Sequence, residues 1–121
     1  MKLLIVDDSN MIRSRISRVV AGGGLSGISI VGLAKNGVEA LKLAQVTKPD
    51  VITMDLTMPE MDGIECISKL LVMNPAFSIL VVSALADRST AIAALRLGAR
   101  GFVAKPFTDQ ELQSALLEMS R

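Results

Sequence analysis

Five polar side chains, standing at the ends of four short apolar runs, are the residues of this sequence best suited to chemistry. They are Asp7, Asp8, Asp55, Ser83 and Lys105. Carboxylates bind hard divalent cations such as Mg²⁺, and an aspartate can also attack a phosphoryl group to form an aspartyl phosphate. A lysine and a serine beside it would supply a positive charge and a hydrogen-bond donor to the phosphoryl oxygens.

A charge count predicts the cation. Two carboxylates ~4 Å apart repel each other by about 4 kcal/mol at an effective dielectric near 20. If Asp7, Asp8 and Asp55 meet beside Lys105, two negative charges remain, and one divalent cation neutralises them. With only oxygen ligands at hand, Mg²⁺ is the expected ion. The alternative is that one carboxyl stays protonated.

Each of these residues also has a simpler interpretation when taken alone. The Asp7-Asp8 pair could cap a helix, and Lys105 could be a solvated strand end. Their occurrence after four different strands favours a shared site. The loop from Asp55 to Gly63 is the most specific feature, because Pro59 and Gly63 restrain the backbone where a carbonyl could face a metal.

The elements that must position these residues alternate along the chain. Apolar runs predict strands at 3–6, 28–34, 51–54, 79–82 and 102–104. Five amphipathic helices are expected. The first begins after Asp8 or Ser9, and the second carries an apolar stripe of Val38, Leu41 and Ala44. The third and fourth are expected over 64–71 and 90–97, and the fifth follows a capping box from Thr108 to Glu111. This is an α/β pattern: one domain over residues 1–121, with a five-stranded parallel sheet that is doubly wound. Ligands of such sheets bind beyond the carboxyl ends of the strands.

Composition excludes several function classes. The chain of 121 residues has no His, which excludes His-based catalysis and His-ligated metals, and its single cysteine, Cys66, excludes an internal disulfide. Without Trp or Tyr, and with a net charge of +1, nucleic acid and membranes are not expected partners. No apolar run approaches a membrane span or the core of a signal peptide, so a cytoplasmic location is expected.

Four motifs in order resemble those of a response-regulator receiver domain of the CheY-like kind, and the resemblance covers essentially the whole chain. They are Val6-Asp7-Asp8-Ser9, the loop 55–63, Val82-Ser83-Ala84 and Lys105-Pro106-Phe107. Chemotaxis receivers are the most similar, both free-standing ones and those that precede a methylesterase. The resemblance implies a flavodoxin-like (βα)5 fold with strand order 2-1-3-4-5.

The resemblance also implies a phosphorylation site in a two-component signalling system. Asp55 matches the phosphoacceptor, which takes its phosphoryl group from a phosphohistidine on a partner histidine kinase. Asp8, Asp55 and the backbone carbonyl of Thr57 match the direct Mg²⁺ ligands, and Asp7 matches the acid that holds metal-bound water. Lys105 matches the lysine that contacts the phosphoryl group, and its bond to Pro106 is typically cis. A protein of this kind catalyses only its own phosphorylation and dephosphorylation.

A conformational switch follows from the same resemblance. Ser83 matches the hydroxyl that moves toward the phosphoryl group, and Phe102 matches the aromatic that swings inward with it. The face formed by the fourth helix, fifth strand and fifth helix would then bind a downstream protein. Ile92, Leu95 and Met119 lie in or near that face, and core packing is the expected role of these three.

Thr57 and Leu85 match two variable positions linked to phosphoryl lifetime. An apolar Leu85 would shield the site from water, which predicts slow hydrolysis of the phosphoryl group.

Three alternatives remain open on the sequence alone. The chain could be the receiver of a longer protein, such as a methylesterase-type regulator, or an interaction module that keeps the fold without phosphorylation. It could also be an aspartyl-phosphate phosphatase of the haloacid-dehalogenase type. Such a phosphatase needs an acid two residues after its nucleophile, where this chain has Ser9 or Thr57.

Two further patterns are discounted. The glycine run 22–27 fits G-x-G-x-x-G but follows a helix instead of a strand, the reverse of a nucleotide-binding context. The arginines of the first helix, Arg13, Arg15 and Arg18, are interpreted as a solvated surface.

Overall fold

The computed structural model describes residues 1–22, 25 and 27–119 and consists of alternating strands and helices. The strands are β1 (Lys2–Val6), β2 (Ser29–Ala34), β3 (Val51–Met54), β4 (Ser78–Ala84) and β5 (Gly101–Lys105). The helices are α1 (Asn10–Ala21), α2 (Gly37–Thr47), α3 (Gly63–Met73), α4 (Arg88–Leu97) and α5 (Asp109–Met119), with a short 3-10 turn η1 (Leu85–Asp87) before α4.

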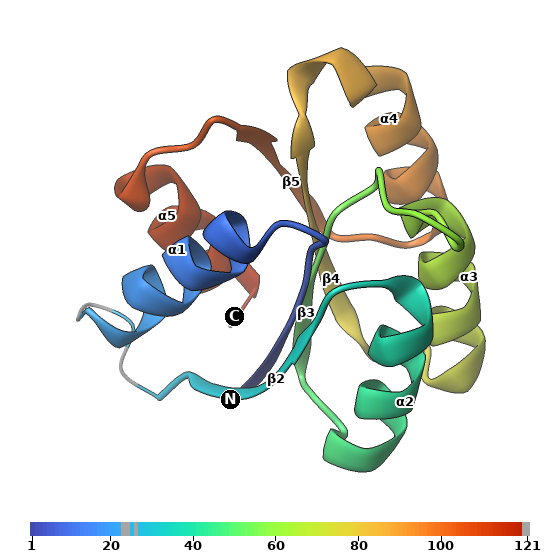
Figure 1. Ribbon diagram of the computed structural model, residues 1–121, viewed down its shortest axis with the longest axis horizontal. Coiled ribbons are helices and arrows are strands. Elements are labelled where there is room, and N and C mark those ends of the chain that lie inside the picture. Colours follow the sequence, from blue (N-terminus) through green and yellow to red (C-terminus); the bar gives the residue numbers. More distant parts are fainter. Residues whose placement is uncertain (23–24, 26, 120–121) are drawn as a thin grey trace.

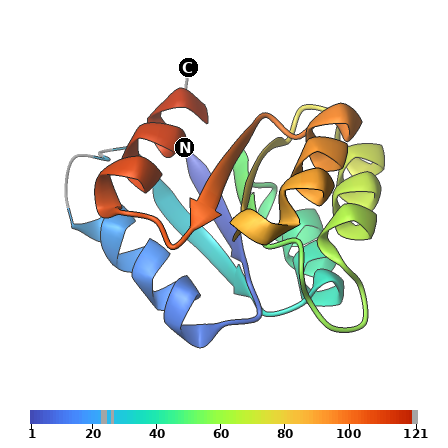
Figure 2. The ribbon, with the colours of Figure 1, turned by 90° about the horizontal axis from the view of Figure 1, so that it is seen from above.

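The strands form one parallel sheet in the order β2-β1-β3-β4-β5. This confirms the expected doubly wound α/β fold and its strand order. Figure 2 shows the sheet as a twisted layer between two groups of helices. Because all five strands run the same way, their carboxyl ends share one edge of the sheet.

Helices cover both faces of the sheet. Figure 1 shows α1 and α5 on one face and α2, α3 and α4 on the other. Alternate residues of β1 enter the two cores: Leu3 and Ile5 pack on the α1 and α5 side, and Leu4 and Val6 pack on the other. Burial on both faces explains why the central strands are mostly apolar.

Local hydrogen bonds account for the helix starts. Ser9 caps α1, with its hydroxyl accepting from the Ile12 N–H at 3.3 Å. Before α5, the Thr108 N–H donates to the Glu111 carboxylate and the Glu111 N–H donates to the Thr108 hydroxyl, both at 3.0 Å. The capping box expected from the sequence is therefore confirmed, and it sets the start of α5 directly after the loop that follows Lys105.

Several apolar residues differ from expectation. Val38 and Ala44 were both predicted to line the inner face of their helix. Ala44 is buried, which confirms its placement, but Val38 is 40% exposed, and Ala40 is buried instead. Ile92 and Leu95 were expected in the core but are 44% and 41% exposed on α4. Small alanines on the inner face of each helix bring the backbone close to the sheet, which turns the larger side chains outward.

Two further expectations concern residues that the structure describes only in part. The side chain of Leu85, and residues 23, 24 and 26 of the glycine run, belong to the parts that the structure does not describe. Cys66 is fully buried, as expected for a small core residue. None of the helices in the described part of the chain has the length and apolar content needed to cross a bilayer.

Candidate functional site

Three aspartates converge at the carboxyl edge of the sheet. Asp7 and Asp8 follow β1, and Asp55 follows β3. Each offers a carboxylate oxygen, and these oxygens all lie within 4.8 Å of one another. Asp7 and Asp55 are buried, with 1% and 4% exposure, whereas Asp8 is exposed. The predicted carboxylate cluster is therefore present.

Strand register brings these acids together. In the β1–β3 pairing Val6 lies opposite Met54, so the residues that follow them, Asp7 and Asp55, lie side by side. The ladder continues through the Asp55 N–H, which donates to the Val6 carbonyl at 3.0 Å. A shift of one residue in either strand would separate the two carboxylates and point one of them into a helical layer.

Lys105 reaches the cluster from the end of β5. Its Nζ lies 2.8 Å from Oδ2 of Asp7 and 3.5 Å from Oδ1 of Asp55. The peptide bond between Lys105 and Pro106 is cis, as the family resemblance implied. One ammonium thus bridges the two buried carboxylates, and the site keeps an excess of negative charge.

Burial and the surplus negative charge both affect the pKa of Asp55. Burial, reinforced by the neighbouring charge of Asp7, raises the pKa of Asp55 to about 7, against lowering contributions from Lys105 and the Thr57 N–H. For Lys105, burial favours the neutral amine, but contacts with Asp7 and Asp55 outweigh it and raise the pKa. A bound cation would favour the ionised Asp55, and the all-oxygen donor set suits a hard divalent ion.

The loop after Asp55 is held in one shape around its glycine. The Gly63 N–H donates to the Leu56 carbonyl at 2.9 Å. A Cβ at Gly63 would lie 2.5 Å from the Asp55 carbonyl oxygen and 2.6 Å from the Leu56 Cα. The Thr57 N–H donates a hydrogen bond to Oδ1 of Asp55 at 3.3 Å, which fixes the start of the loop beside the acid. Thr57 therefore lies where its backbone could contribute to a metal site.

Ser83 is buried at the carboxyl end of β4, and its hydroxyl is engaged. Its Oγ donates to Oδ2 of Asp87 at 3.0 Å. The Thr57 hydroxyl donates to the same oxygen at 3.3 Å. Sequence reasoning missed Asp87, because an aspartate just before a helix suggests a helix cap. In the structure Asp87 occupies the N-cap position of α4 but makes no side-chain cap bond.

These groups line one open hollow of about 460 Å³, whose walls come from four strand ends and η1. The lining residues are Asp8, Asp55, Thr57, Ser83, Ala84, Asp87 and Lys105. Phe102 does not line this hollow; it is partly buried in β5 and packs against the core on the α2–α4 side. The structure thus brings together the acids, the lysine and the serine that the sequence singled out.

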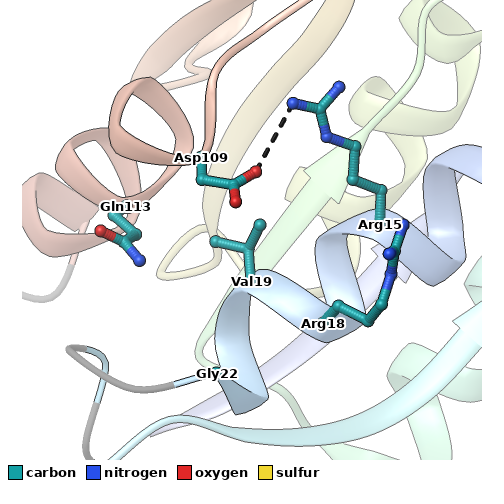
Figure 3. Close-up of a pocket in the computed structure, with 6 residues that line it drawn as sticks. All are labelled: Arg15, Arg18, Val19, Gly22, Asp109 and Gln113. Atoms are coloured by element: carbon teal, nitrogen blue, oxygen red, sulfur yellow. Dashed lines mark hydrogen bonds and ion pairs between the residues drawn. The ribbon is translucent and has the colours of Figure 1, made fainter.

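A second groove, of about 240 Å³, lies between α1 and α5 (Figure 3). Arg15 extends toward Asp109, with its Nη2 3.5 Å from the carboxylate oxygen. Its guanidinium also stacks 4.6 Å from the centre of the Phe107 ring, and Arg13 donates to the Asp7 carbonyl. The interpretation of both arginines as merely solvated was therefore wrong. Arg13 joins α1 to the end of β1, and Arg15 joins α1 to the loop after Lys105. Both arginines therefore hold segments that carry residues of the site.

Comparison with known proteins agrees with this geometry. The model of the response regulator receiver domain family matches residues 3–117. The chemotaxis protein CheY of Listeria monocytogenes is 37% identical over 116 residues, which are 96% of this chain and 95% of that protein.

Two solved structures are similar throughout. The response regulator domain of Thermotoga maritima CheB has a TM-score of 0.86 at 34% identity, covering 100% of this chain and 97% of that one. The Borrelia burgdorferi CheX–CheY–BeF3–Mg²⁺ complex has a TM-score of 0.90 at 27% identity, covering 100% and 90%. With its aspartate cluster and lysine at the carboxyl edge of the sheet, this chain belongs to the response regulator receiver domain family.

Proposed function

We propose that this chain is the phosphoacceptor of a two-component system, in which Asp55 takes a phosphoryl group from a partner histidine kinase. The observation that supports this most is the convergence of Asp7, Asp8 and Asp55, within 4.8 Å, beside the Lys105 ammonium. A phosphodonor must come from outside, because the chain has no histidine of its own.

The transfer uses the ionised carboxylate of Asp55 as nucleophile. One oxygen forms a bond to phosphorus as the bond from phosphorus to the histidine nitrogen breaks, and the electron pair of that bond leaves with the imidazole. Lys105 lies close enough to balance charge on the phosphoryl oxygens. Asp55 in its protonated form would not attack, so a pKa near 7 makes the metal-free site a poor acceptor in mild acid.

Asp8, Asp55 and the Thr57 carbonyl would hold Mg²⁺, and Asp7 would hold a water on it. The oxygen donors and the surplus negative charge of the cluster fit this ion. When bound, Mg²⁺ supplies positive charge to the phosphoryl oxygens. The similar CheY structure from Borrelia burgdorferi is a complex with BeF3 and Mg²⁺, which supports the assignment.

Phosphorylation would be read out on the face formed by α4, β5 and α5. Ser83 follows the phosphoryl group, Phe102 changes position with it, and the balance between two conformations shifts. Ile92 and Leu95 are exposed on α4 and are available to a downstream protein. In the Borrelia burgdorferi complex CheY is bound to CheX, which supports a protein partner for this chain too.

Chemotaxis is the proposed setting, with residues 1–121 acting as a single receiver domain and the cytoplasm as its expected location. The similarity to Listeria monocytogenes CheY over 95% of that protein supports a CheY-like role in chemotaxis. The similarity to the receiver of Thermotoga maritima CheB supports the alternative, a receiver that belongs to a methylesterase-type regulator.

The decisive experiment is intact-mass spectrometry after incubation with Mg²⁺ and acetyl phosphate. The wild type should gain the mass of one phosphoryl group, and Asp55→Asn should gain none. Glu65→Gln, which removes an exposed acid on α3, is the matched control and should be modified like the wild type. Equal modification of Asp55→Asn would move the acceptor elsewhere. Continuous turnover of a phosphate ester would instead favour the phosphatase alternative.

A further inference from the structure

We propose that Asp87 is a latch that holds the Ser83 hydroxyl in the unphosphorylated state and competes with the phosphoryl group for it. The inference rests on the proposed function, because the latch opposes a phosphoryl group on Asp55. It deepens that function by naming the residue that sets how readily this receiver switches.

The hydrogen bonds of η1 carry the inference. Oδ2 of Asp87 accepts from the Ser83 Oγ at 3.0 Å and from the Thr57 Oγ1 at 3.3 Å. These two donors come from the ends of β4 and β3, and both residues line the same hollow as Asp55. One carboxylate oxygen thus joins the end of the strand that precedes the phosphoacceptor, and the end of the neighbouring strand β4, to the turn that begins α4.

The position of Asp87 in the helix argues that these bonds are its role. An aspartate at an N-cap ordinarily accepts a hydrogen bond from a backbone N–H in the first turn of the helix. Asp87 makes no such bond with α4. By contrast, Asp62 caps α3 by accepting from the Glu65 N–H at 2.9 Å. The carboxylate of Asp87 is directed to the hydroxyls of the site instead of to its own helix.

Competition follows from the chemistry of a hydroxyl. Ser83 has one O–H to donate, so a hydrogen bond to Asp87 leaves none for a phosphoryl oxygen. A phosphoryl group on Asp55 is a stronger, more highly charged acceptor in the same hollow, and its charge also repels the Asp87 carboxylate. When Ser83 turns toward the phosphoryl group, Asp87 loses its main partner, and η1 and the start of α4 are released together. The latch therefore links the chemistry at Asp55 to the helix that carries the exposed Ile92 and Leu95.

The test measures the affinity for BeF3⁻ in the presence of Mg²⁺, by ¹⁹F NMR titration, in the full chain. Asp87→Ala frees the Ser83 hydroxyl and should tighten binding by about tenfold, the equivalent of one charge-assisted hydrogen bond. Asp87→Asn keeps an uncharged acceptor and should give a smaller gain. Glu65→Gln is the charge-matched control, because the Glu65 carboxylate pairs with Lys69 on the surface of α3, and it should bind like the wild type.

A double-mutant cycle separates a latch from plain charge repulsion. In a Ser83→Ala background there is no hydroxyl to hold, so adding Asp87→Ala should tighten binding much less than it does in the wild type, by the relief of charge repulsion alone. If the gain is equally large in that background, the carboxylate acts by its charge alone and the latch is refuted. Unchanged affinity of Asp87→Ala in the wild-type background would refute it as well. Failure of the wild type itself to bind BeF3⁻ with Mg²⁺ would refute the proposed function, and the latch with it.

Discussion

At the scale of single residues, the site is defined by a carboxylate that the fold has made costly to ionise. Asp55 is buried beside Asp7, and one lysine does not compensate both charges. A bound cation would relieve this cost. A carboxyl that is poised in this way is a common property of functional sites and a rare one in the rest of a protein.

The raised pKa of Asp55 predicts how stability depends on pH in the absence of metal. Between its ordinary value of 3.8 and about 7, the folded protein binds a proton at Asp55 that the unfolded chain has lost. The contribution of this group to the free energy of unfolding is therefore fully present below pH ~4 and is lost as the pH rises through about 7. Asp55→Asn has no carboxyl to ionise at this position. Near pH 8, with a chelator present, its free energy of unfolding should therefore exceed that of the wild type by on the order of 2 kcal/mol.

Urea unfolding at both ends of this pH window would check the prediction. Near pH 4 the wild type and Asp55→Asn should have nearly equal free energies of unfolding. Asp109→Asn removes a carboxylate whose side chain is 67% exposed, and it should show no comparable gain at high pH. A gain for Asp55→Asn that is the same at both pH values would mean that ionisation is not its cause.

At the scale of elements, the loop between β3 and α3 holds the acid and its neighbouring carbonyl in place. Its shape depends on the absence of a side chain at Gly63, where the backbone of Asp55 and Leu56 passes too close for a Cβ. The sequence indicated a constrained turn here from Pro59 and Gly63. The close approach itself involves residues eight apart in the chain and becomes visible only in three dimensions.

Gly63→Ala should therefore be destabilising by more than about 2 kcal/mol, since rigid backbone atoms must move to admit the methyl group. Gly101→Ala is the control, because its new Cβ would first meet the flexible end of Met119 at 2.8 Å. Thermal unfolding of the two variants would compare them. A loss at Gly63 no larger than at Gly101 would contradict the close approach.

The outer surface of α4 gives a second prediction at this scale. Ile92 is 44% exposed, whereas Ile67 of α3 is fully buried. Ile92→Ala should cost less than about 1 kcal/mol of stability, but Ile67→Ala should cost about 2–5 kcal/mol because it leaves a cavity. Denaturant unfolding measures both. Similar losses would place Ile92 in the core, as the sequence alone had suggested.

At the scale of the whole molecule, the parallel sheet places residues from four parts of the chain at one edge. The β1–β3 and β4–β5 pairings set the depth of each side chain there. Helices on both faces bury the strands, and at the shared edge Asp7, Asp55 and Ser83 stay buried while Asp8 is exposed. The carboxylate cluster proposed to bind Mg²⁺ is therefore a property of the assembled fold, and the unfolded chain has no counterpart of it.

Binding of Mg²⁺ should consequently stabilise the folded state. A ligand that binds only the folded form at about 100 times its dissociation constant adds about 2.7 kcal/mol. Scanning calorimetry should show an unfolding temperature that rises with MgCl₂ in the wild type. Asp8→Asn removes an exposed ligand and should lose most of the rise without losing the fold. NaCl at equal ionic strength is the control, and a rise that NaCl reproduces would indicate charge screening instead of a site.

The sequence by itself determined the alternation of strands and helices, the fold class and the identity of the acids, the serine and the lysine. These follow from hydrophobic patterning and from what stands after each apolar run, both of which are local. Only the tertiary structure showed that Asp87 takes the Ser83 hydroxyl, that Arg15 stacks on Phe107, and that Ile92 and Leu95 face outward. Helical periodicity identifies an apolar stripe but not which of its residues the neighbouring layer covers. Contacts between distant side chains depend on register and packing, which no local pattern encodes.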